Sequence, residues 1–133
     1  MKSLETDINS AADRENFLEI MVTDIIQQMG MPAHIKGYWY LRRAIILCIE
    51  NNDMINSVTK LLYPAIAAEF NTNASRVSTN ISRAIEIIWD RGNEKVLCLY
   101  FGNTVGKMKR KPTNAEFIAL ISDTLRLRLK NST

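Results

Sequence analysis

The sequence predicts an all-α fold, a bundle of six helices that contains a helix-turn-helix. Apolar residues recur at helical spacing through most of the 133 residues. No segment alternates apolar and polar residues over six or more positions, and no Asn-Gly or Asp-Gly hairpin turn occurs. The length suits one domain with a hydrophobic core of its own.

The first helix is expected over residues 14–29 and the second over residues 36–51. Asp13 is a candidate N-cap of the first helix, and Gly30 followed by Pro32 ends it. The inward face of the first helix is expected to comprise Phe17, Ile20, Met21, Ile25, Ile26 and Met29. The apolar face of the second helix comprises Tyr40, Leu41, Ala44, Ile45, Leu47 and Cys48.

The middle of the chain is expected to hold a short helical approach, 57–62, and then two helices, 64–70 and 74–90. Pro64 fits the first turn of the third helix, where no backbone N–H is needed. Asn71-Thr72-Asn73 separates the third and fourth helices with residue types that favour turns and N-caps. The fourth helix is expected to face inward with Val77, Ile81, Ile85, Ile88 and Trp89.

Two more helices, 94–101 and 114–128, complete the expected bundle. Thr113 and Glu116 have the spacing of a capping box at the start of the last helix. Its inner face comprises Phe117, Leu120, Ile121 and Leu125. The loop before it is basic, and its side chains either contact phosphates or keep the loop solvated: Lys107, Lys109, Arg110 and Lys111.

Charge divides the chain into an acidic N-terminal extension, residues 1–15, and a helical body, residues 16–133. Residues 1–30 have a net charge of −4 and residues 31–133 a net charge of +7. A basic body favours a polyanionic partner, although ordinary surface charge gives the same total. The extension is expected either to shield the basic body or to be disordered.

Cysteine usage and hydropathy predict a cytoplasmic protein with no membrane contact. Cys48 and Cys98 lie in apolar segments, which is typical of buried thiols in a reducing compartment. The N-terminus has no apolar signal-peptide core, and the longest apolar run, 44–49, is too short to span a bilayer.

Three spacings in the middle of the chain meet the demands of a helix-turn-helix. Ala67 is small enough for a second helix to cross it, and Asn71, four residues later, tolerates a left-handed backbone. Val77 then pins the second helix to the first. A helical hairpin in any small bundle could show the same pattern, so the exposed residues of the second helix decide between the two interpretations.

The exposed start of the fourth helix favours DNA. No carboxylate appears there before Glu86, and short hydrogen-bonding or basic side chains suit phosphates and base edges. The positive end of the helix dipole points the same way. The candidate DNA-binding residues on this helix are Ser75, Arg76, Ser78, Thr79, Ser82 and Arg83.

Four strings carry a family resemblance: GMPAHIKGYWYLRRAI (30–45), SVTKLLYPAIAAEFNTNASRV (57–77), AIEIIWDRGN (84–93) and KPTNAEFIALISDTLRL (111–127). From about residue 18 to residue 127 the chain resembles the DNA-binding effector domain of the stage zero sporulation protein A family. The resemblance implies a six-helix bundle whose third and fourth helices form the helix-turn-helix. It also implies binding to promoter boxes as head-to-tail pairs, and activation or repression of transcription.

The family's base-reading helix begins Ser-Arg-Val, which Ser75, Arg76 and Val77 match, so the resemblance makes Arg76 the main reader of guanine. The next positions depart, with Ser78-Thr79 in place of Glu-Arg and Ser82-Arg83 in place of Arg-His. We therefore expect DNA binding to persist with an altered or more loosely read box.

The resemblance also implies a surface for the sigma subunit of RNA polymerase, where Phe101, Gly102 and Val105 match. Val96 and Cys98 replace small polar residues there, and Phe101 could simply pack in the core. About thirty residues stand where the family has a phosphoacceptor receiver domain, too few for that fold. We therefore expect regulation without a receiver.

Other candidate sites are weaker. His34 has no clustered ligands, so neither a metal nor another cofactor is expected, and no catalytic motif indicates an enzyme. Tyr38-Trp39-Tyr40 could stack single-stranded nucleic acid but is better explained by packing. The sequence thus favours a specific duplex DNA-binding regulator. The alternative is an interaction protein that modulates the full-length regulator or RNA polymerase.

Overall fold

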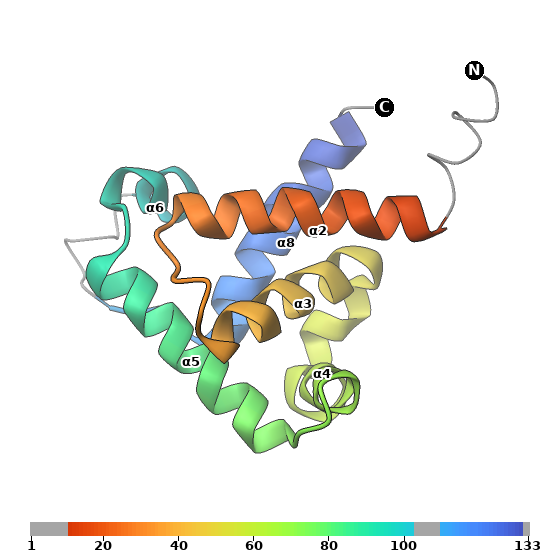
Figure 1. Ribbon diagram of the computed structural model, residues 1–133. Coiled ribbons are helices and arrows are strands. Elements are labelled where there is room, and N and C mark those ends of the chain that lie inside the picture. Colours follow the sequence, from red (N-terminus) through yellow and green to blue (C-terminus); the bar gives the residue numbers. More distant parts are fainter. Residues whose placement is uncertain (1–10, 103–109, 132–133) are drawn as a thin grey trace.

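The computed structural model describes residues 11–102 and 110–131. These ranges form helices and no strand, which confirms the all-α class (Figure 1). The α-helices are α2 (Ala11–Gln28), α3 (Lys36–Glu50), α4 (Tyr63–Glu69), α5 (Ala74–Arg91), α6 (Glu94–Phe101) and α8 (Asn114–Asn131). No helix of the described ranges is long and apolar enough to cross a membrane.

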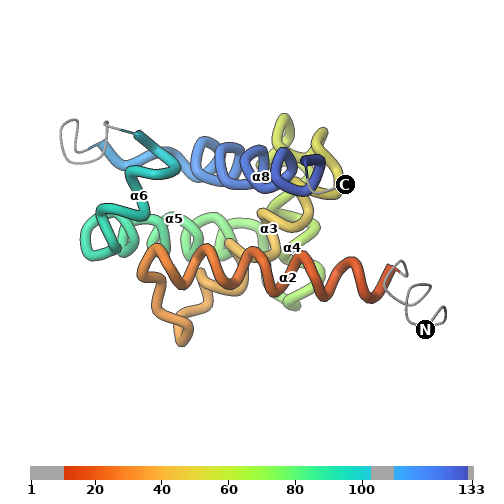
Figure 2. The backbone as a smooth tube through the Cα atoms, turned by 90° about the horizontal axis from the view of Figure 1, so that it is seen from above, coloured from red at the N-terminus to blue at the C-terminus, as the bar shows by residue number. Residues whose placement is uncertain are grey.

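Helix α3 is the centre of the bundle and packs against α2, α5 and α8. Seen from above, α2 and α8 lie on opposite sides, with α3 and α5 between them (Figure 2). Most of α3 is apolar, and it buries residues around nearly its whole circumference, as a helix enclosed by others must. Tyr38 and Tyr40 belong to this buried set, while Trp39 is 42 % exposed, so packing accounts for two of the three aromatic residues.

The inward face of α2 differs from the predicted one. Phe17 and Ile20 are 56 % and 68 % exposed, and Met21 is only half-buried. The buried stripe comprises Leu18, Val22, Ile25, Ile26 and Met29. Apolar residues cover more than one stripe of this helix, and α3 packs against only one side of it. The choice of stripe therefore depends on docking, which periodicity alone does not reveal.

Helix α2 also begins earlier than predicted. It starts at Ala11, which places Asp13 inside the first turn rather than at the N-cap. The positive end of the helix dipole stabilises a carboxylate in the first turn. Residues 11–15, which the charge pattern assigns to the N-terminal extension, are thus helical.

The segment between α3 and α4 is helical but irregular. A 3-10 helix, η1 (Asn52–Ser57), is followed by a π-helical turn, η2 (Val58–Leu62), where a short helix over 57–62 was expected. Asn51 starts η1 by accepting a hydrogen bond from the N–H of Asp53 at 3.1 Å. Pro64 then lies in the first turn of α4, as predicted.

The capping box at the start of α8 is confirmed. The N–H of Thr113 donates to Glu116 Oε1 at 2.9 Å, and the N–H of Glu116 donates to Thr113 Oγ1 at 3.1 Å. The backbone hydrogen bond from Thr113 is the main reason that the pKa of Glu116 lies below its ordinary value. At its other end, α8 runs to Asn131, three residues beyond the predicted end at residue 128.

The two cysteines differ in burial. Cys48 is a buried free thiol of α3, as predicted, and burial raises its pKa to about 11. Cys98 is free as well but only half-buried on α6. A thiol with a raised pKa is mostly protonated near neutrality, so Cys48 behaves as a small apolar core residue.

Helices α3 and α5 approach so closely that only glycine fits at Gly37. A Cβ atom added there would overlap the carbonyl oxygen of Asn80 and lie 2.8 Å from the Cβ of Ala84. Both contacts belong to the inner side of α5, which has little room to move. Gly37 therefore determines how deeply α5 sits against the central helix.

We expect Gly37→Ala to lower the free energy of unfolding by about 1–3 kcal/mol, because overpacking outweighs the higher helix propensity of alanine. Urea denaturation followed by circular dichroism measures the change. Lys36→Ala, at the exposed neighbouring position, is the control and should stay within about 0.5 kcal/mol of the parent. Equal stability of the two variants would contradict the close α3–α5 approach.

Candidate nucleic-acid interface

A short turn joins α4 to α5 and sets the angle between them. Asn71 has φ of 55°, the left-handed conformation predicted for it. The N–H of Thr72 donates to the carbonyl of Ala67 at 2.9 Å, which is the long hydrogen bond of a Schellman motif. The chain therefore leaves α4 abruptly and starts α5 within a few residues.

The two residues expected at the crossing of these helices are both in the core. Ala67 on α4 is 5 % exposed and Val77 on α5 is fully buried. The helices pack directly against each other. Ala67 and Val77 thus lie in the core, and Asn71 forms the left-handed turn between α4 and α5, as their spacing predicted.

The N-terminus of α5 is capped and free of acidic residues. Asn73 Oδ1 accepts a hydrogen bond from the N–H of Arg76 at 2.9 Å, and the first turn contains no carboxylate. The remaining free N–H groups and the helix dipole make this end electropositive. Such an end attracts anions when it is accessible.

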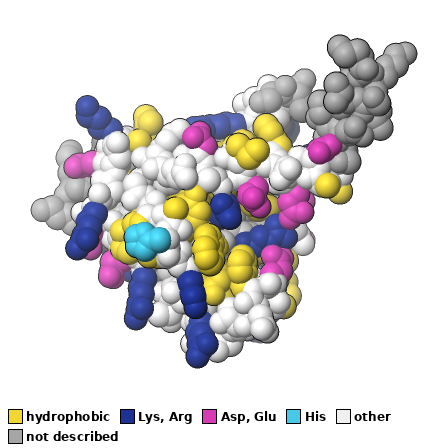
Figure 3. All heavy atoms as spheres, in the orientation of Figure 1, with side chains coloured by type: hydrophobic (Ala, Val, Ile, Leu, Met, Phe, Trp, Pro, Cys, Tyr) yellow, Lys and Arg dark blue, Asp and Glu magenta, His cyan; other side chains and the backbone are white. Residues whose placement is uncertain are grey.

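The face of α5 opposite the core is open. Ser75, Arg76, Thr79 and Arg83 are exposed, whereas Ser78 and Ser82 are half-buried at one edge of this face. Basic side chains project along the α5 side of the molecule (Figure 3). Among the described residues, neither Arg76 nor Arg83 forms an ion pair. The inner stripe comprises Val77, Ile81, Ala84, Ile85 and Ile88.

A groove of about 470 Å³ runs beside this face, between α5 and the segment that leads into α8. Lys111 lies at its edge, with Nζ 3.3 Å from Ser82 Oγ and 3.7 Å from Glu86 Oε2. Asn114 Nδ2 donates to the Ser78 carbonyl at 3.1 Å and to the Tyr63 hydroxyl at 3.0 Å. Because Tyr63 belongs to α4, Asn114 holds both helices of the turn against α8.

The basic loop before α8 is only partly visible. Lys107 and Lys109 lie outside the described residues, as does Val105. Arg110 is exposed, and its Nη1 lies 3.7 Å from Glu116 Oε1. Lys111 reaches the α5 groove, which the sequence had no means of indicating.

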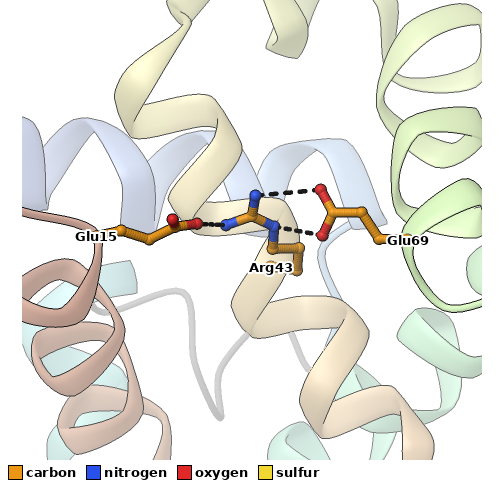
Figure 4. Close-up of polar contacts among 3 residues, drawn as sticks. All are labelled: Glu15, Arg43 and Glu69. Atoms are coloured by element: carbon orange, nitrogen blue, oxygen red, sulfur yellow. Dashed lines mark hydrogen bonds and ion pairs between the residues drawn. The ribbon is translucent and has the colours of Figure 1, made fainter. Parts of the chain in front are cut away.

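An ion-pair cluster that sequence reasoning missed links α2, α3 and α4. Arg43 of α3 donates to Glu15 of α2 at 2.6 Å and to both carboxylate oxygens of Glu69 at 2.7 and 3.1 Å (Figure 4). Burial lowers the pKa of Arg43, but the hydrogen bonds to Glu69 and Glu15 outweigh it and raise the pKa overall. The partners are 26 and 28 residues away in sequence, so no local pattern could have revealed the cluster.

Glu69 is the last residue of α4 and the acid nearest to the turn in sequence. Its bidentate contact with Arg43, which also pairs with Glu15, offsets part of that carboxylate's charge and holds it toward α3. The cluster therefore limits the negative charge that the turn presents beside the start of α5.

Phe101 is half-buried rather than displayed. Its ring centroid lies 5.4 Å from that of Trp89 and 5.2 Å from that of Phe117 in the core. This packing supports the simpler explanation of Phe101, and a contact with polymerase stays a prediction. Leu99 on the same helix is 81 % exposed, which sequence reasoning did not single out.

The remaining candidate residues are His34 and two carboxylates of α5, Glu86 and Asp90. His34 is exposed, and within residues 11–102 and 110–131 no three His, Cys, Asp or Glu residues gather as metal ligands would. Glu86 and Asp90 are both exposed on α5, and Glu86 pairs with Lys111.

These features define a class, an all-helical domain that presents an acid-free helix start beside a polar groove. Residues 22–125 match the model of the family described as "Sporulation initiation factor Spo0A C terminal". Because the match covers most of the chain, the protein belongs to this family. Its members are sporulation-related DNA-binding domains that regulate transcription, so the family implies DNA as the partner.

We expect Asn71→Ala to lower the free energy of unfolding by about 1 kcal/mol, since alanine is strained in the left-handed region. Asn71→Gly is the matched control, because glycine adopts this conformation freely, and it should retain the parent's stability. Thermal and urea denaturation of the three proteins provide the comparison. An alanine variant as stable as the glycine variant would show that the turn is not constrained at Asn71.

Proposed function

We propose that the chain is a sequence-specific regulator of transcription that binds duplex DNA and acts in sporulation control. In this proposal α4 and α5 form a helix-turn-helix, and α5 enters the major groove. The observation that carries the proposal is the open, acid-free first half of α5 on the side opposite the core. A DNA-binding regulator of this kind works in the cytoplasm, where the bacterial chromosome lies.

Arg76 is proposed as the principal base reader. It lies in the first turn of α5, is exposed, and forms no ion pair with any described residue. A guanidinium with both edges free can donate two parallel hydrogen bonds to guanine. Ser75 and Thr79 flank it with short side chains that can donate to base edges or phosphates.

The phosphate contacts are proposed to come from the margins of the same surface. Arg83 extends the exposed face of α5 by two turns beyond Arg76, and Ser78 and Ser82 line its edge. The basic loop contributes Lys107, Lys109, Arg110 and Lys111. Binding to tandem boxes would place two copies head to tail on the DNA.

A second candidate function is an interaction protein that modulates the full-length regulator or RNA polymerase. The observation that favours it is the exposed Leu99 on α6, two residues before the proposed sigma-contact residue Phe101. The other proposed sigma contact, Val105, lies outside the described residues. Selection from random duplexes, followed by gel shifts with the family's promoter box, separates the two functions. An enriched sequence supports the DNA reader. No enrichment, together with stable binding of purified polymerase or regulator, supports the modulator.

We expect Arg76→Ala to weaken binding to the selected duplex by about 1–3 kcal/mol and to relax the preference at one base position. Arg91→Ala removes the same charge from the exposed far end of α5 and serves as the matched control. Fluorescence anisotropy with specific and scrambled duplexes measures both effects. If the Arg76 variant distinguishes the two duplexes as well as the parent does, Arg76 is not the reader.

We also expect affinity to fall steeply with salt. About five phosphate contacts give a slope of about −4 to −5 for log affinity against log salt. Titrations between low and physiological ionic strength measure the slope. A slope near zero would contradict a surface that binds the phosphate backbone.

A further inference from the structure

The groove beside α5 is lined by groups that suit a single phosphate. Lys111 and Arg83 supply positive charge, and the hydroxyls of Ser78, Thr79, Ser82 and Thr113 supply hydrogen-bond donors. The groove adjoins the exposed face of α5 rather than lying apart from it. A duplex held against that face would bring its backbone within reach of these groups.

Glu86 is the one carboxylate among the described residues that line this groove. Its Oε2 atom lies 3.7 Å from Lys111 Nζ, and the side chain is 62 % exposed while that of Lys111 is 32 % exposed. The ammonium group of Lys111 thus already has an anionic partner. A phosphate entering the groove must compete with Glu86 for it.

We propose that this groove takes one backbone phosphate of the DNA duplex and that Glu86 restrains DNA binding by holding Lys111. This inference rests on the proposed function. It adds that Glu86, a residue of the same surface, competes with the DNA phosphate for Lys111. The competition is weak enough to reverse, because an exposed ion pair at this distance contributes little and phosphate is the stronger partner. Glu86 thereby sets the affinity of the surface without touching the DNA.

Ser82 keeps the ammonium group of Lys111 close to the groove. Its hydroxyl lies 3.3 Å from Lys111 Nζ, one helical turn before Glu86 on α5. When Lys111 leaves Glu86, it can remain beside Ser82 and turn toward the open side of the groove. Asn114, three residues after Lys111, is hydrogen-bonded to α4 and α5. The backbone near Lys111 is therefore anchored while its ammonium group moves.

The test is a double-mutant cycle on the full chain, measured as Kd for a selected duplex by fluorescence anisotropy. Glu86→Gln should tighten binding about two- to fivefold, the size expected for release of an exposed ion pair. Lys111→Gln should weaken binding and reduce the salt slope by about one unit, as loss of one phosphate contact does. In the Lys111→Gln background, Glu86→Gln should have no effect beyond general charge.

Asp90→Asn measures that general charge effect, because Asp90 is exposed one turn further along α5 and does not line the groove. Thermal denaturation of every variant confirms that the fold is retained. If Glu86→Gln tightens binding no more than Asp90→Asn, or tightens it equally without Lys111, the restraint is wrong while the proposed function stands. If Lys111→Gln leaves the salt slope unchanged, the groove holds no phosphate. A parent chain that binds no duplex at all overturns the proposed function and this inference together.

Discussion

The close packing of α5 on the central helix α3 is the constraint on which the rest depends. Gly37 allows the α5 backbone near Asn80 to approach α3, and the inner stripe from Val77 to Ile88 is then removed from water. Among the described residues, the side of α5 opposite this stripe carries the exposed side chains Ser75, Arg76, Thr79 and Arg83. The exposure of the outer face of α5, which is the proposed DNA-binding surface, therefore follows from how the core is packed.

Ion pairs reduce the negative charge around the exposed face of α5. Two carboxylates that flank the start and middle of the surface, Glu69 and Glu86, are each held by a base from another element, Arg43 and Lys111. Arg43 is half-buried and bidentate, so that contact is durable, whereas the Lys111 contact is longer and more exposed. The first helps to define the fold around the turn. The second is available to change when an anion approaches.

Local signals were sufficient where a short segment determines its own conformation. The left-handed turn at Asn71 and the capping box of Thr113 and Glu116 follow from residue type and spacing alone. The limits of α3, α4, α5 and α6 agree with the predicted ranges to within a residue. The same locality explains why the sequence predicts the exposure of Ser75, Arg76, Thr79 and Arg83 on α5, since helical periodicity separates inner from outer positions. Ser78 and Ser82 are half-buried instead, because the segment before α8 packs beside them.

The sequence by itself determined the helices, the turn between α4 and α5 and the membership of the outer face of α5, because each depends on neighbours a few residues apart. Tertiary structure alone decided which stripe of α2 faces inward, leaving Phe17 and Ile20 exposed. It also brought Arg43 to Glu15 and Glu69, and Lys111 to Glu86. These outcomes depend on how the helices dock. The partners lie far apart in sequence, so no local sequence pattern could predict that they meet.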